Sequence, residues 1–258
     1  MNTTQTVLSP IRDSFQGLWG NKKTITLMAL TFALIVSVSA VIPYIGQFIY
    51  AAGLIVLTPT IIYFATHKKT AIKTAFTSSR QNILPAFLWF LQLFIIVIAI
   101  IATLTLIVIT TVIENGNETI AFLSVLITIL ALVIVVTIWT TATAAAAVGY
   151  HNPLQVAFKT LANVKSVLTI IVTYAITWLL QVIVSLPLLA IIASTLLSTE
   201  VNTAPTAGLY VMITVITFVS FFVSTLTYTL ITSTQGILAL DRVGDTMPRR
   251  QPATVPEV

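Results

Sequence analysis

The chain has 258 residues, of which 57% are hydrophobic and only 7% are charged. Because soluble domains carry about 25% charged residues, this composition excludes an ordinary water-soluble domain, and it is too apolar for a disordered chain. The chain contains no cysteine, which excludes disulfide frameworks, thiol catalysis and cysteine-bound metal or iron–sulfur centres. The net charge of +5 does not indicate nucleic-acid binding, because the basic residues lie between apolar segments.

Six apolar segments are long enough to cross a membrane as helices, which takes about 20 residues each. The first two share one uncharged stretch, 24–66, which we divide at Pro43 and Gly46 because proline and glycine interrupt helices. One kinked helix followed by a re-entrant segment is the alternative for this stretch. The predicted spans are residues 24–42, 47–66, 83–113, 120–149, 167–197 and 207–240. The predicted fold class is therefore all-α, a polytopic six-helix transmembrane bundle.

The basic residues predict the orientation of the spans, because cytoplasmic loops of membrane proteins are enriched in lysine and arginine. In the six-span arrangement all 12 basic residues fall on one side, whereas the other side carries Glu114, Glu118 and Glu200 and no lysine or arginine. The basic residues are Arg12, Lys22, Lys23, Lys68, Lys69, Lys73, Arg80, Lys159, Lys165, Arg242, Arg249 and Arg250. We therefore predict a multi-pass protein of the cell membrane with both termini in the cytoplasm.

A short amphipathic helix is predicted before each pair of spans. Ser9-Pro10 and Asn152-Pro153 have the form of helix starts, with an N-cap residue followed by proline. In each segment apolar residues share one helical face and basic residues occupy the others, as in a helix that lies on an anionic membrane surface. The shared faces are Ile11, Phe15, Leu18 and Trp19; Ile72, Ala75, Phe76 and Ser79; and Leu154, Ala157, Phe158 and Leu161.

The chain also contains signs of an internal repeat. The segments WFLQLFI at 89–95 and WLLQVIV at 178–184 match at an offset of 89 residues, and the same offset places Trp139 over Tyr228. This pattern predicts three units, each an amphipathic helix plus a transmembrane hairpin, at about 9–66, 70–149 and 153–240. The units form one domain, 1–240, and residues 241–258 are predicted to be a flexible cytoplasmic tail.

This layout resembles a group of prokaryotic membrane proteins, the stand-alone membrane domains like those attached to glycerophosphoryl diester phosphodiesterases, and related uncharacterised archaeal families. The stretch Leu238-Ala239-Leu240-Asp241-Arg242 is similar to the group's closing apolar–aromatic–Asp–Arg signature, although the tyrosines of that signature are absent here. The resemblance implies a membrane domain without catalysis, because this sequence contains no phosphodiesterase domain.

The predicted spans contain no aspartate, glutamate, lysine, arginine or histidine, so we expect no catalytic residue, metal site or cofactor. The candidate contacts to anionic lipid are Lys22, Lys23, Lys68, Lys69, Lys73, Arg80, Lys159 and Lys165. Gln92 and Gln181 are the most polar residues well inside spans, and they either line a shared cavity or form bonds between helices.

Further polar residues have simpler expected roles. Gln235, His67 and His151 are expected at the membrane interface. The span threonines are expected to bond a carbonyl one turn back, and the small residues at 142–147 are expected to let helices approach closely.

Two functional hypotheses follow. The first is a non-enzymatic bundle that binds membrane lipids or supports a protein partner, including a second copy of itself, and it is motivated by the basic amphipathic helices beside uncharged spans. The alternative is a transporter component that resembles an ABC exporter permease and requires a separate ATPase. An intramembrane enzyme is disfavoured because the spans offer only hydroxyls and amides.

Overall fold

The computed structural model describes residues 7–39, 45–67, 69–110, 118–198 and 207–243. Within these ranges the chain forms helices and no β-strand, which confirms the predicted all-α class. The elements are α1 (Ser9–Gly20), α2 (Lys22–Ser39), α3 (Ile45–Thr66), α4 (Ile72–Ser79), the short 3₁₀ helix η1 (Arg80–Asn82), α5 (Ile83–Ile109), α6 (Glu118–Val148), α7 (Pro153–Leu161), α8 (Val164–Ser198) and α9 (Ala207–Val243). Each of the short helices α1, α4 and α7 therefore precedes two longer ones.

Five helices in the described part of the chain, α3, α5, α6, α8 and α9, are long and apolar enough to cross a membrane. The first predicted span corresponds to α2, which has 18 residues. The end of that span and Pro43 lie outside the described residues. A membrane crossing by α2, which would raise the number of spans from five to six, therefore stays a prediction. α9 continues to Val243, beyond the predicted end at 240, and the rest of the predicted tail, 244–258, also lies outside the described residues.

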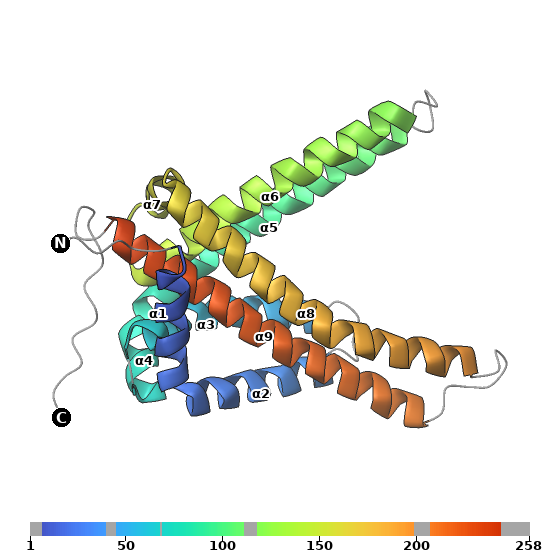
Figure 1. The fold of residues 1–258 in the computed structure, drawn as a ribbon, viewed down its shortest axis with the longest axis horizontal. Helices are drawn as coiled ribbons and strands as arrows, with labels where there is room; N and C mark the ends of the chain where they lie inside the picture. The colour runs from blue at the N-terminus through green and yellow to red at the C-terminus, as the bar shows by residue number, and fades with distance from the viewer. Residues whose placement is uncertain (1–6, 40–44, 68, 111–117, 199–206, 244–258) are drawn as a thin grey trace.

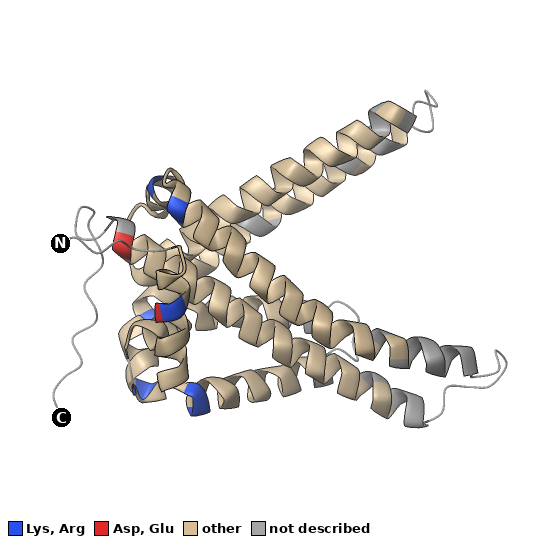
Figure 2. Ribbon diagram, viewed as in Figure 1, with Lys and Arg blue, Asp and Glu red and all other residues tan. Residues whose placement is uncertain are grey.

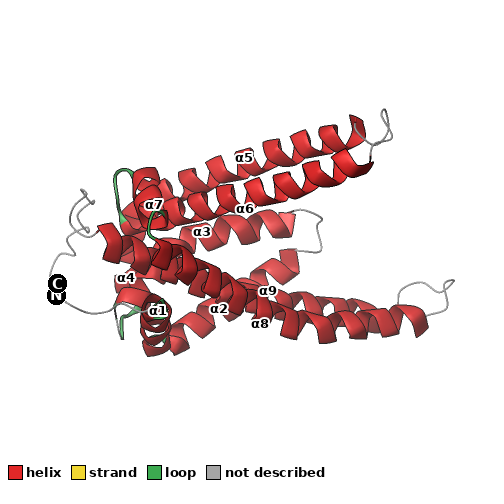
Figure 3. Cartoon of the chain, turned by 45° about the horizontal axis from the view of Figure 1, so that its top comes forward, coloured by secondary structure: helices red, strands yellow, loops and turns green. Residues whose placement is uncertain are grey.

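Helix α9 lies in the middle of the packed region and contacts α2, α3, α6 and α8 (Figures 1 and 3). Small residues allow this close packing, as predicted for 142–147. Ala145 of α6 and Ala239 of α9 are both fully buried and share a cluster with Tyr150 and Val156. A β-carbon on Gly236 would lie only 2.7 Å from Ile62 Cγ2 of α3. Helices that meet through alanine and glycine bring their backbones close together, which favours van der Waals packing.

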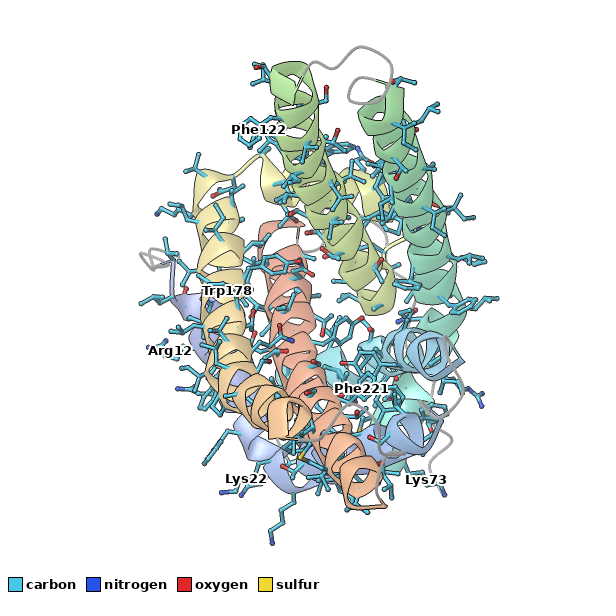
Figure 4. The ribbon with its side chains drawn as sticks, turned by 90° about the vertical axis from the view of Figure 1, so that its right-hand side faces the viewer. Arg12, Lys22, Lys73, Phe122, Trp178 and Phe221 are labelled. Atoms are coloured by element: carbon cyan, nitrogen blue, oxygen red, sulfur yellow. The ribbon has the colours of Figure 1, made fainter. Side chains whose placement is uncertain are left out.

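The hairpin of α5 and α6 diverges from the hairpin of α8 and α9, so the molecule has a wedge shape in Figure 1. Beyond the packed region many described apolar side chains of both hairpins are exposed. Phe122 of α6 is 68% exposed and Trp178 of α8 is 66% exposed, and both project from their helices in Figure 4. Long apolar helices with such surfaces are those of a membrane protein, because water would make this exposure very unfavourable.

The short helices α1, α4 and α7 lie together at the packed end, which we call the basic end. Figure 2 shows that lysine and arginine residues gather there and that, within the described residues, the long helices carry none away from their ends on this side. The structure thus brings together basic residues that are as much as 153 positions apart, such as Arg12 and Lys165. Lys68, Arg249 and Arg250 lie outside the described residues.

The predicted helix starts are correct in place but not in detail. α1 begins at Ser9 with Leu8 as its N-cap, so the prediction of Ser9 as the N-cap is wrong by one residue. Asn152 does occupy the N-cap position of α7 but makes no capping bond. Its amide donates instead to Gln155 Oε1 at 3.3 Å, so proline, rather than a side-chain cap, favours the start of α7.

Candidate functional site

The predicted lipid-contact residues that the structure describes are all exposed at the basic end. They are Lys22, Lys23, Lys69, Lys73, Arg80, Lys159 and Lys165, and Lys68 lies outside the described residues. Arg12 pairs with Asp13, with 3.7 Å between Nε and Oδ1, but none of these seven residues has a carboxylate partner in the described part of the chain. Their charges are therefore available to an external anion.

Each short helix turns a small side chain toward the bundle and the next residue, a phenylalanine, away from it. The three pairs are Ser14 (0% exposed) with Phe15 (55%), Ala75 (0%) with Phe76 (46%), and Ala157 (0%) with Phe158 (54%). On α4 and α7 the predicted faces therefore mixed two sets of residues, because their small members are buried in the bundle whereas Ile72, Phe76 and Phe158 are exposed. Exposed aromatic rings beside exposed lysines are typical of a membrane–water interface.

Aromatic and basic side chains also interact directly on α1. The rings of Phe15 and Trp19 stack with 5.7 Å between their centroids. The Lys22 ammonium lies 4.5 Å from the centroid of the Trp19 ring, which is within the range of a cation–π interaction. This cluster combines an apolar surface with a positive charge at the start of α2.

Close backbone contacts hold α1 against α3. A β-carbon on Gly17 would lie 1.8 Å from the carbonyl oxygen of Ala65, so only glycine fits at this crossing. α4 is held by Ala75, which packs with Ile25 and Phe64, and by a 3.0 Å bond between the hydroxyls of Ser79 and Thr60. The short helices are thus fixed parts of the bundle.

Asn21, between α1 and α2, joins this corner to the end of α3. Its Nδ2 donates to the carbonyls of Gly17, Phe64 and His67 at 3.1, 3.0 and 2.9 Å, and its Oδ1 accepts from the Thr70 backbone N–H at 2.9 Å. Phe64 lies in the last turn of α3, where carbonyls lack an intrahelical partner. Asn21 is only 5% exposed. Nothing local in the sequence marks an asparagine that caps a distant helix, so this role was not predictable.

The structure does not bring Gln92 and Gln181 together. Gln181 Nε2 donates to Ser224 Oγ of α9 at 3.2 Å, which is the predicted bond between helices. Gln92 is exposed on α5 and, with Trp89, lines a shallow groove of about 580 Å³. The Trp89 ring lies 6.0 Å from that of Trp139 on α6. The two glutamines therefore do not line one cavity, although each follows a tryptophan by three residues.

Gln235 is buried, 1% exposed, so its expected place at the membrane interface is wrong. Its Nε2 donates to Thr140 Oγ1 at 3.1 Å, and that hydroxyl lies 3.4 Å from the Tyr174 hydroxyl. Gln235 Oε1 has no hydrogen-bond partner among the described residues. Three helices, α6, α8 and α9, thus share a polar cluster inside the bundle.

The span threonines behave as predicted. Thr141 donates to the Thr137 carbonyl at 2.8 Å, and Thr225 donates to the Phe221 carbonyl at 2.7 Å. These bonds satisfy the hydroxyls within their own helices. The Tyr228 hydroxyl of α9, in contrast, bonds to another helix, since it lies 2.7 Å from the hydroxyl of Thr58 on α3.

Both histidines are exposed at the basic end. The His67 ring stacks on that of Tyr63 with 4.0 Å between centroids, and its Nδ1 lies 2.9 Å from Thr66 Oγ1. Among the described residues, no three histidines, cysteines or carboxylates lie close enough together to hold a metal ion.

Comparison of the chain with protein-family models, with curated proteins and with solved structures gave no match. The resemblance to phosphodiesterase-associated membrane domains therefore stays a prediction.

Proposed function

We propose that this chain is a non-enzymatic, six-span protein of the cell membrane that binds anionic lipid through its basic end, with both termini in the cytoplasm. The observation that carries the proposal is the gathering of seven exposed basic side chains on one end of the bundle, beside the exposed rings of Phe15, Phe76 and Phe158. Each lysine or arginine near an anionic leaflet contributes about 1 kcal/mol of attraction. The cytoplasmic orientation follows from the same charges.

The proposal includes a membrane crossing by α2, which brings the number of spans to six, and an arrangement in three repeated units. Leu27 and Leu34 of α2 are 65% and 58% exposed, as expected of side chains that face lipid. The order of one short helix and two long helices occurs three times, and the buried–exposed pairs of α1, α4 and α7 are equivalent in all three. Both observations support the repeat.

The test neutralises one part of the basic end. The triple variant Lys69→Gln, Lys73→Gln, Arg80→Gln removes three charges around α4, and the matched control Lys69→Arg, Lys73→Arg, Arg80→Lys keeps them. Native mass spectrometry of delipidated protein titrated with phosphatidylglycerol measures the Kd. Loss of three contacts of about 1 kcal/mol each weakens binding by up to about a hundredfold. Equal affinity of the neutral variant and the wild type contradicts the proposal.

The transporter alternative is supported by the way the two hairpins diverge away from the basic end (Figure 1). In this alternative α4 and α7 contact a separate ATPase. Native mass spectrometry of protein extracted from its own membrane separates the two hypotheses. A co-purifying ATPase supports the transporter, whereas a lone chain that carries anionic lipid supports the lipid-binding bundle.

A further inference from the structure

An apolar groove lies between α6 and α8, and α7 lines one end of it. Its volume is about 970 Å³, at the upper end of the ~300–1,000 Å³ of ligand pockets. Val133 and Ile134 of α6 line one side, Ile170 and Ile171 of α8 line the other, and Phe158 of α7 also lines the groove. Thr137 and Tyr174 are the polar members of the lining. An apolar groove of this kind suits a hydrocarbon chain.

The groove begins near the basic end and runs inward along α6 and α8. On α8 its lining begins at Val167, three residues from the start of the helix, and on α6 it extends to Leu132, sixteen residues before the end at Val148. At about 1.5 Å per residue, the lining lies about 5–15 Å from the start of α8 and about 15–24 Å from the end of α6. Because the hydrocarbon of one leaflet is about 15 Å thick, half of a core of about 30 Å, a groove of this length can take much of one acyl chain.

We call the end of the groove that is lined by residues of α7 its mouth, and exposed basic residues adjoin this end. Lys159 is exposed and follows the lining residue Phe158, and Lys165 is exposed in the first turn of α8, two residues before the lining residue Val167. Figure 2 shows both of these helices with basic residues at this end of the bundle. No carboxylate in the described part of the chain pairs with either lysine. The mouth therefore suits the phosphate of a lipid whose chain enters the groove.

We propose that the groove between α6 and α8 holds one acyl chain of an anionic phospholipid, with the headgroup phosphate at Lys159. This inference rests on the proposed function, since it specifies where one of the bound lipids sits and which part of it is recognised. The bound chain separates the two hairpins near the packed end and so stabilises the wedge shape.

The test uses a phosphatidylglycerol probe with a diazirine on one acyl chain, present at a small fraction in phosphatidylcholine nanodiscs that contain the full chain. After irradiation, peptide mass spectrometry locates the label. We expect residues 132–138 and 167–174 to take more label than the exposed outer part of α6 around Phe122. A phosphatidylcholine probe should label the groove less. Uniform labelling of exposed helix surfaces, or equal labelling by the two probes, overturns the inference.

Two substitutions that fill the groove provide the matched test. Ile171→Trp and Val133→Trp extend a larger ring from opposite walls, and both residues are more than half exposed, so the bundle can fold around either ring. Each should lower groove labelling about tenfold, the loss expected when roughly two methylene groups are excluded. Leu168→Trp, on α8 outside the groove lining, is the control and should label as the wild type does. Unchanged labelling in both groove variants contradicts the inference.

Lys159 tests the headgroup contact separately. Lys159→Gln should lower phosphatidylglycerol labelling about fivefold without changing phosphatidylcholine labelling, and Lys159→Arg should restore it. Cross-linked dimers in place of lipid adducts would identify a second copy as the occupant and overturn the proposal. The α4 triple variant distinguishes the two proposals, because it tests the basic end without altering the groove. If the α4 triple variant binds phosphatidylglycerol as the wild type does and the groove is still labelled, only the proposed role of the basic end is refuted.

Discussion

The strongest stability prediction concerns Asn21. Its Oδ1 accepts one hydrogen bond and its two Nδ2 hydrogens are shared among three carbonyl oxygens, and these contacts, two buried and two partly buried, join the α1–α2 corner to the end of α3. A net hydrogen bond contributes about 1 kcal/mol. Because the partly buried groups can bond to water when the side chain is lost, we expect Asn21→Ala to reduce the free energy of unfolding by about 3 kcal/mol.

The variant Asn21→Asp tests the direction of these bonds. An aspartate keeps the acceptor for the Thr70 N–H but replaces the donor with a carboxylate that faces three carbonyl oxygens. We therefore expect Asn21→Asp to be destabilised at least as much as Asn21→Ala. Asn163→Ala is the matched control, since that residue makes a local bond to the backbone N–H of Lys165 and its loss should cost about 1 kcal/mol or less.

Equilibrium unfolding in mixed micelles with increasing sodium dodecyl sulfate, followed by circular dichroism, measures these differences. Trp19, two residues from the substitution, reports the same corner by fluorescence. If Asn21→Asp unfolds at the wild-type midpoint, Asn21 does not act as a donor to α3, and the account of how α1 and α2 are joined to the bundle fails.

Three further substitutions test the packing by the same unfolding measurement. Gly17→Ala should cost about 1–3 kcal/mol, because its β-carbon meets the Ala65 carbonyl; Gly20→Ala on the exposed end of α1 is the control, and equal stability of the two contradicts the close crossing. Tyr228→Phe should cost about 1 kcal/mol through loss of its bond to α3, and no change would mean that this bond contributes nothing. Gln235→Leu removes one hydrogen bond together with an unpartnered buried oxygen, so we expect a change within about 1 kcal/mol of zero; a loss of several kcal/mol would show that the oxygen has a partner in the membrane.

The helices and the gathering of charge at one end were predictable because both depend on local properties. Long apolar stretches form helices in a membrane whatever their neighbours are, since every backbone polar group must be bonded within the segment. The lysines lie in every second loop, and successive loops alternate between the two sides of the membrane. These charges therefore gather at one end. Residue chemistry and chain order suffice for such conclusions.

The surroundings of individual side chains were not predictable in this way. Trp89 and Gln92 repeat as Trp178 and Gln181 in the sequence, yet Trp89 packs on Trp139 while Trp178 is exposed, and only Gln181 bonds to a neighbouring helix. Equivalent motifs differ because each helix has different neighbours. Gln235 was misplaced for the same reason, since its position near a helix end does not reveal that α6 and α8 cover it.

The sequence by itself determined that this is an all-helical chain with a membrane-protein surface, small residues at 142–147 and lysines beside the apolar segments. The tertiary structure decided that α9 lies in the middle, that Asn21 caps α3, and that α6 and α8 diverge to leave an apolar groove. The physical reason is that helix formation and charge placement depend on each segment alone. Packing, in contrast, depends on which small residues meet, such as Ala145 and Ala239, and these lie far apart in the chain.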